Sequence, residues 1–330
     1  MPKISITIPV YNVEKYLPRC MNSIVSQACT DDYEIICVDD GSTDKSGEIL
    51  NTYANKFPII KVIHQENQGL SEARNTAMKY VTGKYTMVVD ADDFLINKAL
   101  STLYEYAERH QADVVVFDYV RGTADLKNIN RQYFGNIHNK YKDEPFNVDT
   151  AEPFVYRYIP VSTWGKLYLT DLIKDLKFEH DLNNQDVPYW DLVYTRARRV
   201  FYLPEPFYYY TVMREDAITQ IKGRKIFDVF RAFSLSEKTL RETGYFEKFK
   251  FIHYAHFTCN LVNRMQKIQP DLRREFVKSV KSYPIDIDYD EFDREDFYQF
   301  EKDNMRIIKF IKENNYKNIE KMMKRKKLWS

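Results

Sequence analysis

The sequence lacks the features of a membrane-spanning or exported protein. No apolar run approaches the roughly 18 residues that a bilayer span needs. The first six residues pass directly into strand-like sequence, without the charged and then apolar segment of a secretion signal. With 44% hydrophobic and 29% charged residues, the composition is that of an ordinary soluble protein. We therefore expect a cytoplasmic location.

The sequence contains few cysteines, and its positive and negative charges nearly balance. The four cysteines (Cys20, Cys29, Cys37 and Cys259) show no paired spacing. Cys20 and Cys37 fall at apolar positions of predicted elements, which favours buried free thiols in a reducing compartment. The formal net charge of the chain is +1, so the composition gives no argument for a nucleic-acid partner.

The first 120 residues contain a regular alternation of strand and helix patterns. Strand-like apolar runs cover residues 4–10, 34–38, 59–64, 85–89 and 113–119, and helical stripes cover 17–25, 49–57, 70–81 and 97–110. This alternation predicts an α/β fold, with a mostly parallel sheet covered by helices on both faces.

The pattern changes twice after residue 120. Periodicity fades over residues 121–149, which is typical of a long exposed excursion. Ordered patterns return at 164–168, 200–203 and 207–210, and helical stripes dominate after about Lys222. Because 330 residues exceed the common size of one domain, we place a boundary near Gly223.

Polar clusters follow three of the predicted strands directly. They are Tyr11-Asn12, Asp39-Asp40 and Asp90-Ala91-Asp92-Asp93. In open α/β sheets, ligands bind beyond the carboxyl ends of the strands. We therefore expect these three clusters to meet at one edge of the sheet.

The cluster of three aspartates, Asp90, Asp92 and Asp93, indicates a metal site. Two carboxylates directed to one point repel each other, and a hard divalent cation with diphosphate oxygens in its shell relieves that repulsion. The alternative interpretation is a solvated turn whose aspartates cap a helix, because turns rich in aspartate are common.

Two further segments suit a nucleotide, and each has a structural alternative. In Asp39-Asp40-Gly41-Ser42-Thr43-Asp44, an aspartate can accept the imide proton of uracil while the following residues cap a helix. In Asn67-Gln68-Gly69-Leu70-Ser71-Glu72-Ala73-Arg74-Asn75, the arginine one turn into a helix can reach a diphosphate. The alternative for Arg74 is a surface arginine that pairs with Glu72 or with nothing.

Together these segments resemble the family 2 glycosyltransferases, an inverting group with the GT-A nucleotide-diphospho-sugar transferase fold. The matching series is Pro9-Val10-Tyr11-Asn12, Val38-Asp39-Asp40-Gly41-Ser42-Thr43-Asp44, Asn67-Gln68-Gly69-Leu70-Ser71 with Ala73-Arg74-Asn75, and Asp90-Ala91-Asp92-Asp93. The resemblance covers roughly the first two-thirds of the chain. It implies a catalytic domain over 1–222, with a nucleotide-sugar half at about 1–120 and an acceptor half at about 121–222. A helical C-terminal region over 223–330 would follow.

The resemblance also implies roles for individual residues. The residues expected to contact the nucleotide-sugar are Pro9, Tyr11, Asn12, Asp39, Asp40, Arg74, Asp90, Ala91, Asp92 and Lys166. Among them, Asp39 would hold the uracil edge. Asp92 would hold Mn²⁺ or Mg²⁺ together with Asp90, because the leaving diphosphate accumulates negative charge. Lys166 belongs to a Trp-x-Lys-Leu-Tyr segment, and a place in the core is the alternative for its surroundings.

An inverting transferase also needs a carboxylate that takes the proton of the acceptor hydroxyl. In the family this residue commonly lies in a Glu-Asp pair, and the matching position here is Asp186. Gln185 replaces the glutamate, so the family pattern is incomplete. A helix N-cap is the structural alternative for Asp186, and Asp181 and Asp191 are the substitutes if the register differs.

The resemblance implies transfer of a sugar from a nucleotide-sugar, in particular a UDP-sugar, to a hydroxyl of a glycan or lipid-linked oligosaccharide acceptor in cell-surface polysaccharide synthesis. A non-catalytic nucleotide-sugar or glycan-binding module is the alternative, because of Gln185. A nucleotidyltransferase is a weaker rival, since Pro9-Val10-Tyr11-Asn12 stands where that class would carry a glycine-rich phosphate loop.

The end of the chain, residues 317–330, is strongly basic and also carries apolar groups. Its basic residues are Lys317, Lys321, Lys324, Arg325, Lys326 and Lys327, against the single acidic Glu320. A basic amphipathic end of this kind can rest on an anionic membrane. We therefore expect either peripheral contact with the inner membrane leaflet or a solvated terminal helix.

Overall fold

The computed structural model describes residues 2–27, 33–96, 98–132, 140–141, 143–212, 223–295, 297–315 and 318. It divides into two compact units. The first contains Met1–Asp181 and Tyr189–Ala217, and the second contains Leu182–Pro188 and Ile218–Ser330. The boundary expected near Gly223 lies beside residues 213–222, which are outside the described residues, so it stays a prediction.

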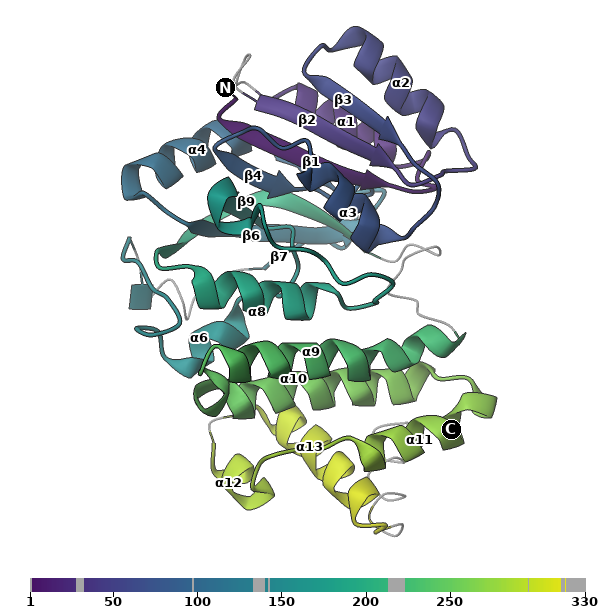
Figure 1. Ribbon diagram of the computed structural model, residues 1–330, viewed down its shortest axis with the longest axis vertical. Coiled ribbons are helices and arrows are strands. Elements are labelled where there is room, and N and C mark those ends of the chain that lie inside the picture. The colour runs from purple at the N-terminus through teal and green to yellow at the C-terminus, as the bar shows by residue number, and fades with distance from the viewer. Residues whose placement is uncertain are drawn as a thin grey trace. The chain divides into compact units, whose positions relative to one another are not determined.

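The first four strands form the parallel half of the sheet in the first unit. They are β1 (Ile4–Val10), β2 (Tyr33–Asp39), β3 (Ile60–His64) and β4 (Tyr85–Val88). They lie in the order β3-β2-β1-β4 and all run parallel (Figure 1). Every residue of β1 is buried, as expected for a strand covered on both faces.

Four helices connect and cover these strands. They are α1 (Leu17–Val25), α2 (Ser46–Lys56), α3 (Leu70–Met78) and α4 (Ala99–His110). Leu17, Cys20, Met21 and Ile24 form the buried stripe of α1. The predicted alternation of strands and helices over the first 120 residues is therefore confirmed, and α3 ends three residues earlier than the pattern at 70–81 indicated.

The other half of the sheet is mixed in direction. It contains β5 (Phe94–Leu95), β6 (Val114–Thr123), β7 (Asn130–Gln132), β8 (Lys166–Leu169) and β9 (Val200–Val212). β9 runs parallel to β6, whereas β8 lies between β4 and β6 and is antiparallel to both. The expectation of a mostly parallel sheet therefore fits β1 to β4 and the β6–β9 pair. β5, β7 and β8 depart from it, since β5 pairs antiparallel with β9, β7 with β6, and β8 with both β4 and β6.

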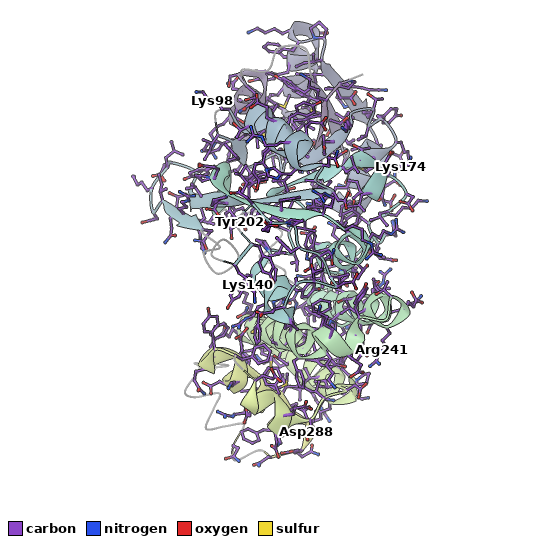
Figure 2. The ribbon with its side chains drawn as sticks, turned by 90° about the vertical axis from the view of Figure 1, so that its left-hand side faces the viewer. Lys98, Lys140, Lys174, Tyr202, Arg241 and Asp288 are labelled. Atoms are coloured by element: carbon purple, nitrogen blue, oxygen red, sulfur yellow. The ribbon has the colours of Figure 1, made fainter. Side chains whose placement is uncertain are left out.

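Aromatic side chains fill the space around β9. The Trp164 ring stacks on the rings of Tyr208 and Tyr210, with centroids 4.8 and 4.9 Å away. Tyr202, labelled in Figure 2, donates its hydroxyl to the fully buried carboxylate of Asp118. Three short or medium helices complete this part of the chain: α6 (Pro153–Tyr158), α7 (Thr170–Ile173) and α8 (Asp186–Arg196).

The second unit is helical over the residues that the structure describes. Its helices are α9 (Asp228–Glu242), α10 (Phe246–Lys267), α11 (Arg273–Ser282), α12 (Tyr289–Arg294) and α13 (Gln299–Lys312), with 3-10 turns at Gly223–Phe227 and Pro270–Leu272. Phe233, Phe257 and Tyr283 pack together in its core. The predicted helical C-terminal region is confirmed for these residues. Residues 283–288, which join α11 to α12, form no strand.

Cys20 and Cys37 are buried free thiols, as predicted. Cys259 is partly buried, and Cys29 lies outside the described residues. Within the described part of the chain, no helix combines the length and the apolar character needed to cross a membrane. The basic tail, apart from Asn318, also lies outside the described residues.

Candidate functional site

The carboxyl ends of β1, β2 and β4 place the predicted polar clusters at one edge of the sheet. Val10 pairs with Asp39 at the end of β1 and β2, and the Val89 N–H after β4 donates to the Thr7 carbonyl of β1. The loops that begin at Tyr11, Asp40 and Asp90 therefore leave the sheet side by side. This edge is the candidate functional site.

The loop after β1 is bound to the loop after β2 through Asn12. The Asn12 side-chain carbonyl accepts hydrogen bonds from the backbone N–H groups of Thr43 (2.8 Å) and Asp44 (3.3 Å), and the Asn12 N–H donates to Ser42 Oγ (3.1 Å). Asn12 adopts a φ of 50°, a conformation that asparagine tolerates better than most residues. One role of Asn12 is thus to join the two loops.

Tyr11 and Pro9 have opposite environments in this loop. Tyr11 is 48% exposed, so its side chain is accessible to a ligand. Pro9 is buried within β1, where it pairs with Val38. Of these two residues, only Tyr11 presents its side chain to the surface, and the predicted contact of Pro9 with a nucleotide stays a prediction.

Asp39 and Asp40 are both buried and perform different tasks. Asp39 accepts from the Ser42 N–H at 3.0 Å and contacts His64 Nδ1 at 2.8 Å. Asp40 accepts from the backbone N–H groups of Gln68 (2.9 Å) and Gly69 (2.8 Å). Asp40 therefore fixes the loop that leads into α3, while Asp39 orders the turn at the end of its own strand.

Arg74 joins α3 to the aspartate cluster. Its guanidinium is 3% exposed and donates to Asp90 Oδ1 at 3.0 Å. It also lies over the Phe178 ring, 5.2 Å from the centroid. The next residue, Asn75, forms two hydrogen bonds with the backbone of Phe178, at 2.8 and 3.0 Å. The partner of Arg74 is thus Asp90, and not Glu72 as in the surface alternative.

Two residues of strand β9 form hydrogen bonds with the aspartate cluster. The Tyr208 hydroxyl donates to Asp93 Oδ2 at 2.7 Å and accepts from the Asp90 N–H at 3.1 Å. Thr211 donates its N–H to Asp93 Oδ1 at 2.7 Å and its hydroxyl to the Asp92 carbonyl at 2.8 Å. Two of these hydrogen bonds hold the backbone of Asp90 and Asp92, and the other two hold the Asp93 carboxylate. Ala91 is buried between the two aspartates that were predicted to bind the metal.

The three carboxylates of the cluster influence one another. Burial, together with the charges of Asp92 and Asp90, raises the pKa of Asp93 well above its usual value. Burial and the charge of Asp93 also raise the pKa of the Tyr208 hydroxyl. The buried Asp93 therefore supports the loop, whereas Asp90 and Asp92 are partly exposed and can meet a ligand.

The donor set suits a cation that also binds phosphate. Among the described residues, no group of three or more His, Cys, Asp or Glu side chains is arranged to hold a metal ion. Asp90 and Asp92 offer two carboxylates, and Asp90 shares one oxygen with Arg74. Mg²⁺ and similar ions commonly bind through one or two carboxylates and take their remaining ligands from water and substrate phosphates. The residues present fit that arrangement.

Lys166 has a buried position. Its ammonium donates to the carbonyls of Pro160 (2.6 Å) and Ser162 (2.5 Å) and lies over the Trp190 ring. The side chain is fully buried. This placement favours a structural role in the turn before β8, and its predicted contact with a nucleotide-sugar stays a prediction.

Asp186 is the first residue of α8 and belongs to the segment Leu182–Pro188 of the second unit. It is half-buried, and Gln185 before it is buried. Of the two substitutes, Asp191 is fully buried and accepts from the Tyr156 hydroxyl, which suits a structural carboxylate. Asp181 is exposed and has a φ of 48°. Between Asp186 and Asp191, the partly exposed Asp186 is the better placed to meet a substrate.

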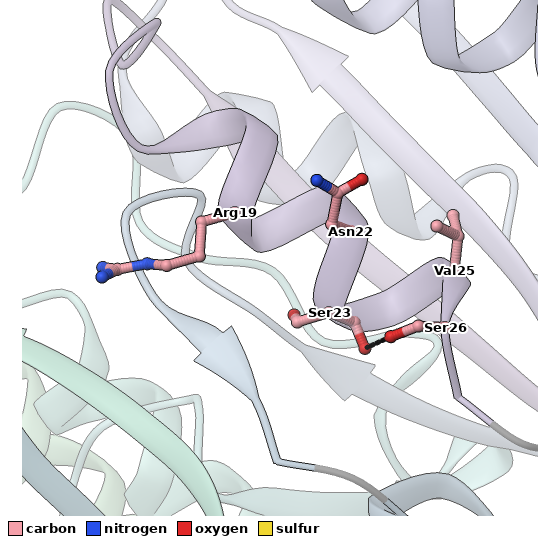
Figure 3. A pocket seen from close by; sticks show the side chains of 5 residues that line it. All are labelled: Arg19, Asn22, Ser23, Val25 and Ser26. Atoms are coloured by element: carbon pink, nitrogen blue, oxygen red, sulfur yellow. Dashed lines mark hydrogen bonds between the residues drawn. The ribbon is translucent and has the colours of Figure 1, made fainter. Parts of the chain in front are cut away.

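A shallow hollow of about 670 Å³ lies along α1, apart from the predicted residues. It is lined by Arg19, Asn22, Ser23, Val25 and Ser26 (Figure 3). The Arg19 guanidinium donates to the Thr211 hydroxyl at 3.0 Å and to the Ala124 carbonyl at 2.7 Å. One route from this hollow to the aspartate cluster is Thr211, which accepts from Arg19 and donates to the Asp92 carbonyl.

Sequence reasoning missed four residues that organise the site: His64, Asn75, Tyr208 and Thr211. Asn75 belongs to the segment Asn67–Asn75, in which only Arg74 was predicted to contact the nucleotide-sugar. Tyr208 belonged to an aromatic strand whose partner was unknown. Nothing in the order of residues shows that positions 93 and 208 meet, since 115 residues separate them.

Comparison with known proteins adds independent findings. Residues 5–159 match the model of the family described as glycosyl transferase family 2. The glycosyltransferase GlyA of Streptococcus pneumoniae is 34% identical over 228 residues, which cover 68% of this chain and 32% of that protein. The glycosyltransferase EpsJ of Bacillus subtilis is 33% identical over 234 residues, which cover 69% of this chain and 66% of that protein. The chain thus spans a third to two-thirds of the length of these relatives.

Among solved structures, TarS 1-349 of Staphylococcus aureus in complex with UDP-GlcNAc has a similar fold. The TM-score is 0.61 at 21% sequence identity, and the match covers 96% of this chain and 92% of that one. At this identity, the likeness establishes the fold. It includes the helical region after the sheet, because nearly the whole chain is covered.

Proposed function

The chain belongs to glycosyl transferase family 2, and from that premise we propose that it transfers a sugar from a nucleotide-sugar, in particular a UDP-sugar, to an acceptor hydroxyl. The acceptor is a glycan or a lipid-linked oligosaccharide of a cell-surface polysaccharide. The observation that carries the proposal is the convergence of Tyr11, Asp39, Asp90 and Asp92 at the carboxyl edge of the parallel strands. A bound UDP-sugar in the TarS complex supports the choice of donor.

Each part of the donor has a counterpart at this edge. The exposed ring of Tyr11 suits stacking with a nucleobase, a contact that any base can make. The Asp39 carboxylate, held by Ser42 and His64, suits the imide edge of uracil. Asp90, already held by Arg74, faces the ribose and diphosphate in this proposal.

Asp90 and Asp92 would hold Mn²⁺ or Mg²⁺, which would neutralise charge on the diphosphate as it leaves. Tyr208 and Thr211 keep the backbone of these aspartates fixed, so their carboxylates need little rearrangement when the donor binds. The guanidinium of Arg74 adds positive charge beside Asp90 and limits the repulsion between the two carboxylates.

The transfer itself is a single displacement with inversion. The acceptor oxygen forms a bond to the anomeric carbon while the bond from that carbon to the diphosphate oxygen breaks. Asp186 takes the proton of the acceptor hydroxyl, and the nucleoside diphosphate leaves with the electron pair of the broken bond. The partial exposure of Asp186 is compatible with this role.

The test is a screen of purified protein against UDP- and GDP-sugars with Mn²⁺, in which release of the nucleoside diphosphate and the sugar product are both measured. Release from at least one UDP-sugar, lost on chelation of the metal, is the expected result. Asp92→Ala, which removes a partly exposed carboxylate of the loop, should lose the metal-dependent release. Binding of UDP and metal without turnover across the panel would instead indicate a non-catalytic binding module.

A further inference from the structure

The turn that leads into α8 is held by side chains of two helices of the second unit. The backbone N–H of Asn183 donates to Asp228 Oδ2 at 3.0 Å, and Asp228 is the first residue of α9. The side-chain carbonyl of Asn184 accepts from Arg264 Nη2, and Arg264 lies in the last turn of α10. Two consecutive residues of one turn are therefore fixed from two different helices.

The guanidinium of Arg264 has a fixed orientation. The residue is 7% exposed, and its Nε donates to the Ile226 carbonyl at 3.2 Å. Its Nη1 donates to Asn260, both to the side-chain carbonyl (3.1 Å) and to the backbone carbonyl (3.3 Å). Burial lowers the pKa of Arg264 to about 10, and the charge of Asp228 opposes that shift. The Arg264 guanidinium is thus a cation at neutral pH, and its hydrogen bonds to three residues fix the plane of the group.

Asn184 occupies the position that sets the direction of α8. Its φ is 63°, in the left-handed region where a residue other than glycine persists only if its surroundings fix it. Its backbone carbonyl accepts from the Val187 N–H at 3.1 Å, which is a bond of the first turn of the helix. Asp186 lies between these two residues, so a rotation of Asn184 moves the Asp186 carboxylate.

We propose that Arg264 and Asn184 are positioning residues that set the location of the Asp186 carboxylate. This inference rests on the proposed role of Asp186 as the base of the transfer. A base must lie within hydrogen-bond reach of the hydroxyl as it attacks in line, and a displacement of about 1 Å can reduce the rate about 100-fold. The contacts that fix the turn before α8, and Asp186 itself, lie within the second unit.

The experiment compares Arg264→Met with wild-type protein in steady-state transfer. Methionine keeps most of the length of the side chain and removes every hydrogen bond. We expect kcat to fall about 10- to 100-fold while KM for the UDP-sugar stays within about twofold, because only the location of the base changes. Arg241→Met is the matched control. This arginine of α9 pairs with Glu237 and Asp286 and not with the turn, so kcat should stay normal.

Variants of Asn184 separate positioning from general stability. Asn184→Asp keeps an oxygen that can accept from Arg264 and tolerates the left-handed conformation, so it should keep kcat within about threefold of wild type. Asn184→Ala loses the acceptor and should reduce kcat as much as Arg264→Met does. The double variant should show no further loss, since both changes remove the same bond. If Arg264→Met fails to fold, the Asn184 pair alone decides.

Two results would overturn the inference. One is a folded Arg264→Met protein with kcat within twofold of wild type, and the other is an equal loss of kcat in Asn184→Asp and Asn184→Ala. Both are distinct from failure of the proposed function. If wild-type protein transfers sugar and Asp186→Asn does not, normal turnover of Arg264→Met refutes only the positioning role. If wild-type protein releases no nucleotide from any donor, the proposed function itself is refuted.

Discussion

Replacing Tyr208 with phenylalanine removes a single oxygen atom at the centre of the aspartate cluster. That oxygen donates to the Asp93 carboxylate and accepts from the Asp90 N–H, and both Tyr208 and Asp93 are at most 1% exposed. The phenylalanine ring can keep the stacking contact with Trp164. The substitution therefore tests the two hydrogen bonds without opening a large cavity.

The expected loss of stability follows from the two partners left behind. A buried group that loses its hydrogen-bond partner costs about 1–3 kcal/mol, and more when the group is charged. Asp93 keeps its bond to the Thr211 N–H, so we expect a total of about 2–4 kcal/mol for the two lost bonds. For a unit of this size, that corresponds to a decrease in Tm of about 4–16 °C.

The same change should also slow transfer, because Asp90 and Asp92 lose a support of their backbone. Thermal unfolding and steady-state nucleotide release are measured for Tyr208→Phe and for Tyr210→Phe. Tyr210 is the matched control, since it stacks on the same Trp164 ring and its hydroxyl makes no hydrogen bond to a described residue. Equal Tm values and equal rates for the two variants would refute the reasoning, because the hydroxyl of Tyr208 would then have no special role.

Four further predictions concern other parts of the chain. Asp92→Ala should abolish Mn²⁺-dependent transfer with an unchanged circular dichroism spectrum, and retained metal-dependent turnover would contradict the metal role. Asp186→Asn should reduce kcat at least about 100-fold with little change in donor KM, and near-normal turnover would move the base to Asp181. Burial lowers the pKa of His253 to about 3, below the ~6.5 of an unfolded histidine. Stability should therefore be complete above about pH 6.5 and decrease as the pH falls toward 3, by about 2 kcal/mol at pH 5, and His253→Gln should flatten that decrease in thermal unfolding. A chain that ends before Lys317 should sediment less with anionic vesicles at low salt than the full chain, and equal partitioning of both would exclude membrane contact through the tail.

Much of the first unit could be predicted because its signals are local. The buried strands β1, β2 and β4 are short apolar runs, and polar residues follow each of them closely, at Asn12, Asp40 and Asp90. Once these strands are parallel neighbours, their loops must meet at one edge. The site could therefore be located from the sequence alone, at the level of loops.

The rest of the fold depends on contacts that are remote in sequence. β8 is only four residues long, and its antiparallel pairing with β4 and β6 joins segments that lie about 50 to 80 residues apart in the sequence. The role of Lys166 was also hard to predict from the sequence. A lysine beside aromatic residues suits either a ligand or the core, and only the carbonyls of Pro160 and Ser162 distinguish these alternatives.

Asp92 and Asp93 show where sequence reasoning reaches its limit within a correctly identified motif. The two residues are identical and adjacent, yet Asp93 is 1% exposed and bound to Tyr208 and Thr211, whereas Asp92 is partly exposed. The difference arises because Tyr208 and Thr211 of β9 donate to the Asp93 carboxylate, whereas the bond from Thr211 to Asp92 reaches its backbone carbonyl. Burial of the Asp93 carboxylate costs free energy. Hydrogen bonds to both of its oxygens offset that cost. The buried Asp93 thus anchors the loop to β9, and this anchor keeps the neighbouring Asp92 where it can meet a ligand.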